Sequence, residues 1–220
     1  MNIFIMADME GISGIINSAQ VSQTEPGYNE GRMLLVRDIN ACVEACHEAG
    51  ADKIIVRDGH GGGDNVVWSE LSSLADWYII GNTGQKRFPG IEECDAVILL
   101  GYHSMAGTPG GILEHTFNSR VIQNMWINGV KAGETAADAI NAGEYGKPVI
   151  LVTGDDKVCK EAKELMPWVV TAEVKRGITW KGGMLLPPEK AYRLIKEKTK
   201  EAISKFREMK PLVVEKPPSS

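Results

Sequence analysis

The chain alternates short, nearly continuous apolar runs with segments in which apolar residues recur every three or four positions. Runs such as "DAVILLGYH" (95–103) and "PVILVTGDD" (148–156) are typical of strands that are covered on both faces. The periodic segments between them, for example residues 29–49, indicate amphipathic helices. Strands that alternate with helices pair in parallel, with helices on both sides of the sheet. The sequence therefore predicts an α/β fold, a three-layer sandwich with a mainly parallel central sheet and helices on both faces.

The same patterns place the individual elements along the chain. We expect strands at 3–8, 53–58, 77–81, 95–103 and 148–155, and extended chain over 169–180. We expect helices at 29–49, 133–146, 155–166 and 187–209. Residues 121–129 alternate and end in Asn128-Gly129, which is a tight-turn signal.

Length and composition favour one globular unit. The chain has 220 residues, of which 43% are hydrophobic and 24% charged, and these are ordinary values for a folded protein. We predict a single α/β domain over residues 1–210 and a short tail over 211–220, which contains "EKPPSS". We also assign the aromatic side chains to packing and not to a binding cage, namely Trp68, Trp77, Tyr78 and Trp126, with Trp180 in a loop, where packing is again favoured over a pocket edge or a subunit contact.

The charge pattern excludes some partners. The net charge is −5, with acidic and basic residues interspersed, whereas a nucleic-acid-binding protein is expected to carry a basic face. No window approaches the roughly 18 apolar residues of a membrane span, and the first residues do not resemble an export signal. We therefore expect no nucleic acid and no membrane as partners, a cytoplasmic location, and four reduced cysteines.

Acidic and imidazole side chains follow the predicted strands at the point where each one ends. Asp8 and Glu10 come after the first strand, His60 after the second, and His103 after the run at 95–103. In open α/β sheets, ligands bind beyond the carboxyl ends of the strands, so these side chains are expected to converge. A glycine-rich stretch then leads to His115, which can fold back over the same edge.

Carboxylates and imidazoles at one edge indicate a divalent metal. Asp8 and Glu10 are spaced i, i+2 and point to the same side of an extended chain, where their charges would repel each other. A metal ion removes that conflict, and zinc takes both carboxylate oxygen and neutral imidazole nitrogen. Individually these residues also have simpler explanations, as a turn cap, a loop residue or a buried histidine bonded to a carbonyl.

The glycines allow a different interpretation. "DGHGGGD" (58–64) and "AGTPGG" (106–111) could cradle a phosphate at the start of a helix. Neither stretch matches the spacing of a P-loop or of a dinucleotide-binding turn, so this signal is weak.

With these residues assembled, the sequence resembles the zinc D-aminopeptidase family, the DppA type. The resemblance rests on "DMEGISG" (8–14), "DGH" (58–60), "GYH" (101–103), "TPG" (108–110), "ING" (127–129) with "GE" (133–134), and "VTGDD" (152–156). It extends over nearly the whole chain, including "AEVKRGI" (172–178) and the last helix.

The resemblance implies a site and an activity. It implies two zinc ions per chain, held by Asp8, Glu10, His60, His103 and Glu134, with His115 as a catalytic residue that does not ligate metal. It implies hydrolysis of short peptides that begin with a D-amino acid, and a homo-oligomer that is ring-like. From the residues alone, Glu134 is only an acid in the first turn of a helix, which the helix dipole favours.

Three alternatives to this activity remain open at this point. The first is a metal-dependent amidase of other specificity on the same scaffold. The second is a non-catalytic α/β protein that binds a phosphorylated small molecule through its glycine loops. The third is a relative that keeps the metal ligands and does not hydrolyse peptides.

Overall fold

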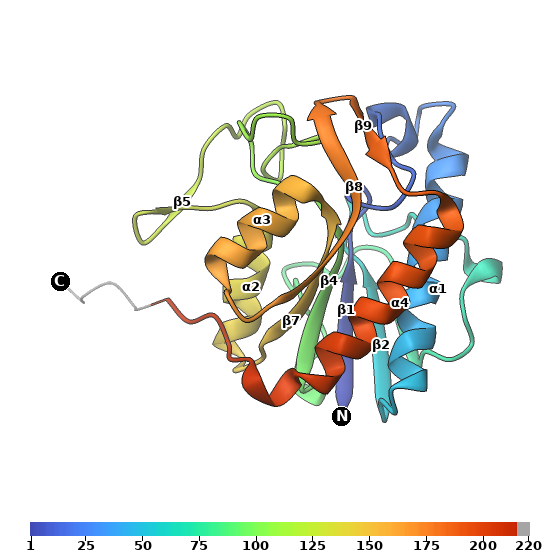
Figure 1. Cartoon of the computed structure of the whole chain (residues 1–220), viewed down its shortest axis with the longest axis vertical. Helices are drawn as coiled ribbons and strands as arrows, with labels where there is room; N and C mark the ends of the chain where they lie inside the picture. Colours follow the sequence, from blue (N-terminus) through green and yellow to red (C-terminus); the bar gives the residue numbers. More distant parts are fainter. Residues whose placement is uncertain (215–220) are drawn as a thin grey trace.

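A computed structural model of the chain describes residues 1–214, and it contains a seven-stranded sheet between two layers of helices (Figure 1). The strand order is β3-β2-β1-β4-β7-β8-β9, and every neighbouring pair is parallel except β8 with β9. The strands are β1 (Asn2–Ala7), β2 (Lys53–Asp58), β3 (Trp77–Ile79), β4 (Ala96–Tyr102), β7 (Val149–Asp155), β8 (Val170–Thr179) and β9 (Gly182–Leu185).

Two helices pack on each face of the sheet. Helices α1 (Tyr28–Glu48) and α4 (Pro188–Ser204) contribute to one hydrophobic core, and α2 (Glu134–Glu144) and α3 (Asp156–Leu165) contribute to the other. The predicted α/β sandwich with a mainly parallel central sheet and helices on both faces is therefore confirmed.

The alternation of side chains in β1 shows why helices cover both faces of the sheet. Ile3 and Ile5 belong to the core under α1 and α4, whereas Phe4 and Met6 belong to the opposite core. All four side chains are fully buried. Because successive residues of a strand point to opposite faces, an apolar run of this kind is stable only between two apolar layers.

The centre of the sheet contains the point at which the strand order reverses. β1 pairs with β2 on one side and with β4 on the other, and the chain passes from β3 back across β1 to reach β4. A crevice forms at such a switch point beyond the carboxyl ends of the strands. Asp8 and His103 directly follow β1 and β4, so the fold places both of them at this crevice.

A small hairpin forms where the sequence predicts a turn. β5 (Trp126–Ile127) and β6 (Val130–Lys131) pair antiparallel, with Asn128 at φ 47° and Gly129 at φ 81° between them. Both central residues therefore have the left-handed conformation that a tight hairpin turn requires.

Several details differ from the prediction. The strand β9 was not expected, because its short "GGML" run reads as a loop. Helix α4 ends at Ser204, five residues before the predicted end at 209. At this position the Ser204 hydroxyl donates a hydrogen bond of 2.7 Å to the Glu201 carbonyl. The expected tail over 211–220 lies outside the described residues from 215 onward, and the boundary at 210 stays a prediction.

Three of the tryptophans that were assigned to packing lie at the surface. Trp68, Trp77 and Trp126 are 70%, 65% and 59% exposed. Two of them lie on or beside β3, a three-residue edge strand that has a neighbour on one side only. The ring of Tyr78 is partly buried and meets Trp68 edge to face, with 6.2 Å between the ring centroids.

The cysteines agree with the expectation for reduced thiols, since Cys42, Cys46, Cys94 and Cys159 are all buried and free of disulfides. Within residues 1–214, none of the helices combines the length and the hydrophobicity that crossing a bilayer demands.

The segment after β1 lies directly against the end of β4. The Asp8 amide donates to the Leu100 carbonyl at 2.8 Å, and the Gly11 amide donates to the Gly101 carbonyl at 2.7 Å. A Cβ atom on Gly11 would lie 1.9 Å from the Tyr102 carbonyl oxygen. Only glycine allows this approach, which fixes the path of the chain that carries Asp8.

We expect Gly11→Ala to lower the free energy of unfolding by about 3 kcal/mol, because the methyl group meets backbone that cannot move aside. Chemical denaturation measures this change. Gly62→Ala is the control, since its Cβ would meet only the flexible Asp64 side chain, at 3.0 Å. Equal stability of the two variants would contradict the close contact.

Candidate metal centre

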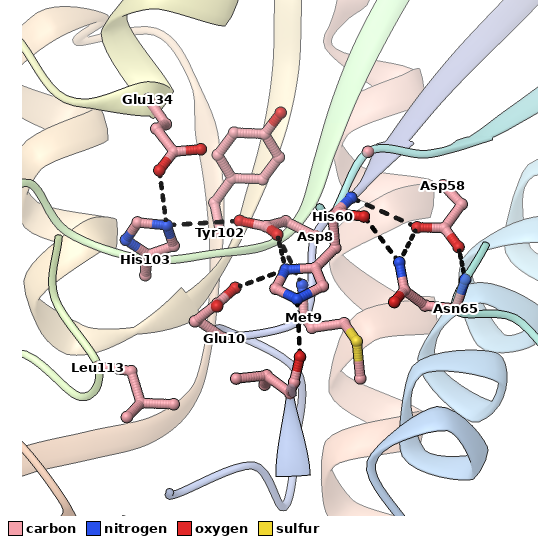
Figure 2. A network of polar contacts seen from close by, with 12 residues as sticks. Asp8, Met9, Glu10, Asp58, His60, Asn65, Tyr102, His103, Leu113 and Glu134 are labelled. Atoms are coloured by element: carbon pink, nitrogen blue, oxygen red, sulfur yellow. Dashed lines mark hydrogen bonds and ion pairs between the residues drawn. The ribbon is translucent and has the colours of Figure 1, made fainter. Parts of the chain in front are cut away.

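The structure brings all six predicted site residues to the crevice between β1 and β4. Figure 2 labels Asp8, Glu10, His60, His103 and Glu134. Asp8 and Glu10 follow β1, and His60 is the second residue after β2. His103 directly follows β4, and Glu134 is the first residue of α2. His115 comes from the long loop between β4 and β5.

Asp8 occupies the middle of the cluster. Its Oδ1 lies 3.0 Å from His60 Nδ1, and its Oδ2 lies 3.5 Å from His103 Nε2. Each histidine has a second carboxylate beside it. Glu10 Oε2 is 3.1 Å from His60 Nδ1, and Glu134 Oε1 is 3.2 Å from His103 Nε2. The two oxygens of Asp8 therefore face two different imidazole–carboxylate pairs, as Figure 2 shows.

His115 lies on the side of His103 and Glu134. The rings of His103 and His115 stack with 4.0 Å between their centroids and an angle of 9° between their planes. His115 Nε2 is 3.5 Å from Glu134 Oε1. Its Nδ1 lies 3.0 Å from the carbonyl of Leu113, a residue held at φ 53°. This bend in the backbone helps to turn the ring toward the cluster.

Each of the three histidines has its other nitrogen on a backbone carbonyl. His60 Nε2 is 2.9 Å from the Val21 carbonyl, and His103 Nδ1 is 3.1 Å from the Ser104 carbonyl. Because a carbonyl only accepts, these nitrogens carry the proton and donate. In the neutral ring, the nitrogen that faces the cluster then presents a lone pair, as a metal ligand or a base must.

The charges in the cluster perturb one another strongly. Burial by itself lowers the pKa of His103, but its ion pair with Glu134 and the charge of Asp8 raise that pKa to about 10. Burial likewise opposes the charged form of His60, yet Glu10 and Asp8 raise the pKa of His60 well above its usual value. Burial favours the neutral form of Asp8, but His60 and His103 lower the pKa of Asp8 far below its ordinary value. Without a metal, protons on the imidazoles therefore balance the carboxylates.

The donor set fits a divalent metal. Glu10 Oε2 and His103 Nε2 are buried side-chain atoms that, among residues 1–214, lie beside an oppositely charged group but make no hydrogen bond of good geometry. Two overlapping groups in the same part of the chain have their ligand atoms within 4.8 Å of one another, Asp8–Glu10–His103 and His103–His115–Glu134. Buried carboxylate oxygens and imidazole nitrogens are what zinc selects. The second group includes His115, which the resemblance had placed outside the ligands.

The loop that carries His60 is fixed from behind by Asp58, a residue that the sequence analysis did not single out. Asp58 accepts hydrogen bonds from the amide and side chain of Asn65, at 2.6 and 2.9 Å, and from the amide of Val66 at 3.2 Å. Asn65 in turn donates to the His60 carbonyl at 2.7 Å. The next elements after this loop are a single 3-10 turn at Trp68–Glu70 and then β3, so the loop does not begin an α-helix as the phosphate cradle considered above requires.

Lys175 of β8 holds the loop that carries Glu10, and the sequence analysis also missed it. Its side chain is 1% exposed, and its ammonium donates to the carbonyls of Glu10, Ile12 and Ile15 at 2.6, 2.9 and 2.6 Å. All three donors of the ammonium are used. The only signal in the sequence was a lysine in the middle of a predicted extended segment. Its partners are main-chain carbonyls far away in the chain, which no side-chain pattern reveals.

Comparisons with known proteins identify relatives of this arrangement. The model of a family described as D-aminopeptidase matches residues 1–220. A D-aminopeptidase of Bacillus subtilis (strain 168) is 36% identical over 216 residues, which are 96% of this chain and 77% of the relative. The solved structure described as the Zn-dependent D-aminopeptidase DppA from Bacillus subtilis, a self-compartmentalizing protease, superposes with a TM-score of 0.94. It shares 33% sequence identity, and the match covers 98% of this chain and 78% of that one.

We expect metal binding to release protons from His60 and His103, because both imidazoles are charged in the metal-free protein at pH 7. Metal affinity should therefore increase as the pH rises from 6 to 9, toward the His103 pKa of about 10. Calorimetric zinc titrations in two buffers of different ionisation enthalpy measure the protons released. A binding heat that does not depend on the buffer would contradict this protonation state.

We expect Lys175→Met to weaken zinc binding at least about tenfold, because three buried carbonyls lose their donor and the loop with Glu10 relaxes. Competition with a chelator measures this affinity on protein that circular dichroism shows to be folded. Lys163→Met is the matched control, since the Lys163 ammonium also bonds a carbonyl, that of Val169, away from the cluster. Unchanged affinity in folded Lys175→Met would show that the contact supports only the fold.

Proposed function

The chain belongs to the D-aminopeptidase family, and we propose that it removes the N-terminal D-amino acid from short peptides by means of two zinc ions. The observation that carries this proposal is the position of Asp8. Its two oxygens face two separate pairs, His60 with Glu10 and His103 with Glu134. We infer that Asp8 is shared by both ions, that Glu10 and His60 serve one, and that His103 and Glu134 serve the other.

Zinc supplies Lewis-acid polarisation of the scissile carbonyl and a water of lowered pKa when it is bound at such a site. The protein residues supply the position and the proton transfers. His115 presents Nε2 to the cluster, while its Nδ1–H is held by the Leu113 carbonyl. Nε2 is therefore the atom at which His115 exchanges a proton with the reacting groups. The stacked His103 ring keeps this imidazole in place.

A short peptide fits the space beside the cluster. A cavity of about 550 Å³ is lined by His60, by residues 21–24 and by the glycine loop at 61–62. The preference for a D-residue comes from the family and is part of the proposal.

We also propose that the protein assembles into a ring-like homo-oligomer. The relative DppA is described as self-compartmentalizing. In this chain, large apolar side chains are exposed on the β5–β6 hairpin and on β8–β9, among them Val130 at 54%, Ile178 at 63% and Met184 at 57%. The hairpin projects from the body of the molecule, where a second copy can reach it (Figure 1).

We expect Asp8→Ala to lose zinc and hydrolysis together, because both predicted ions depend on its carboxylate. Elemental mass spectrometry should find two zinc ions per chain in the wild type, and hydrolysis of D-alanyl against L-alanyl dipeptides tests the specificity. His47→Ala is the control, since His47 lies on α1 in its last turn, outside the cluster.

The variant His115→Ala separates metal binding from turnover within the same experiment. It should retain zinc and lose turnover at least about 100-fold, as expected when a positioned acid–base group is removed. If His115→Ala loses zinc, His115 is a ligand. Wild-type protein that takes up no stoichiometric zinc would overturn the two-metal mechanism.

A further inference from the structure

A second cavity, of about 370 Å³, lies beside the one at His60 and carries positive charge. It is lined by Arg57 at the end of β2, by residues 61–62 and by residues 81–87. Arg57, Lys86 and Arg87 are cationic, and none of the lining residues is acidic. The two cavities share residues 61–62 and 81–82 and therefore adjoin.

Among residues 1–214, only one of these three cationic side chains is paired with an acidic residue. Arg87 is paired with Asp138 through two hydrogen bonds, of 2.9 and 2.7 Å, and its NH1 also donates to the Gly59 carbonyl at 3.1 Å. Asp138 accepts a further hydrogen bond from the Tyr102 hydroxyl. One carboxylate therefore balances one of the two guanidinium groups, and within the described part of the chain Arg57 and Lys86 form no ion pair.

Arg57 is the unusual residue of this group. Only 8% of it is exposed, and its Nε and NH1 have no hydrogen-bond partner among residues 1–214. The oxygens of the neighbouring Asp58 are bonded to Asn65 and Val66. A buried guanidinium without a partner is costly, and proteins keep such a group where an anion comes to it.

The backbone leaves the cavity open. An added Cβ at Gly61, Gly81 or Gly84 would meet no atom within 4 Å, so these positions border empty space. The segment at 82–86 is held in shape by its own hydrogen bonds. The Thr83 hydroxyl donates to the Lys86 carbonyl at 2.7 Å, and the Gly84 amide donates to the Asn82 side chain at 2.8 Å.

We infer that this cavity, bordered by Arg57, Lys86 and Arg87, binds the C-terminal carboxylate of the peptide substrate. The inference rests on the proposed peptidase function and specifies its substrate as short peptides with a free C-terminus. A peptide whose first bond lies at the metal centre extends past His60 through the shared residues 61–62. Its carboxylate then meets guanidinium groups, which bind carboxylates in a planar, two-point geometry.

The test compares the zinc enzyme on D-alanyl-glycyl-glycine and on its C-terminal amide. We expect the KM of the free peptide to be at least about tenfold lower than that of the amide, with similar kcat, since the carboxylate contributes binding far from the reacting bond. Arg57→Met and Lys86→Met should raise the KM of the free peptide toward that of the amide and leave the amide unchanged. Arg193→Met, on the exposed side of α4, is the matched control.

A binding measurement complements the kinetics. Calorimetry with the product glycylglycine should show affinity in the wild type and at least about tenfold less in Arg57→Met. Folding is not expected to limit these variants. Arg57→Met removes a buried charge without a partner, so its melting temperature should not fall, and Lys86 is exposed.

The outcomes separate this inference from the function on which it rests. If neither peptide is cleaved, the proposed peptidase function is overturned and the substrate assignment with it. If both are cleaved with the same KM, the function stands and the carboxylate site is overturned. The carboxylate site would also be overturned if Arg57→Met lost the homo-oligomer while the KM of the free peptide stayed unchanged. The cationic cavity would then hold an acidic group of a second copy of the chain.

Discussion

The buried carboxylates of Asp8, Glu10 and Glu134 are the constraint on which the rest of the structure depends. They lie within hydrogen-bond reach of two imidazoles at a place where almost no water enters, and such a cluster is stable only with compensating positive charge. Protons on His60 and His103 supply that charge in one state, and metal ions supply it in the other. The surrounding fold keeps the ligand atoms aimed at one another in both states.

Four of the proposed ligands could be placed at one site from the sequence because their positions follow from local geometry. Asp8, Glu10, His60 and His103 each lie within three residues of the end of a parallel strand, and the carboxyl ends of neighbouring strands meet at one edge. Glu134 is different, since it starts a helix that is reached through a loop of about thirty residues. Its approach to His103 depends on the path of that loop, and only the family resemblance indicated it.

The residues that the sequence analysis missed act through backbone groups. Lys175 bonds three carbonyls that lie at least 160 positions away in the chain, and Asp58 bonds amides of its own loop. The pattern of side chains along a sequence indicates burial and periodicity, but it does not indicate which main-chain carbonyl a lysine will bond. The exposed Trp68 and Trp77 were misjudged for a related reason. An aromatic run indicates a strand, but not that the strand is a short edge with one neighbour.

The loop at 59–63 lies between the cluster of carboxylates and imidazoles and the cationic cavity, and under the proposed function this has a consequence for substrate length. On one side, His60 lies among the carboxylates of Asp8 and Glu10. On the other, the Gly59 carbonyl accepts from Arg87, next to the unpaired Arg57. A peptide with both ends free is itself a dipole, with an ammonium group at one end and a carboxylate at the other. With zinc bound, the ions offset the carboxylates of the cluster, so the cationic cavity supplies the field that would orient the carboxylate end of the peptide. Because one short loop fixes the separation of the cluster and the cationic cavity, we propose that the site favours peptides of a few residues over longer chains, whose carboxylate would lie beyond the cavity.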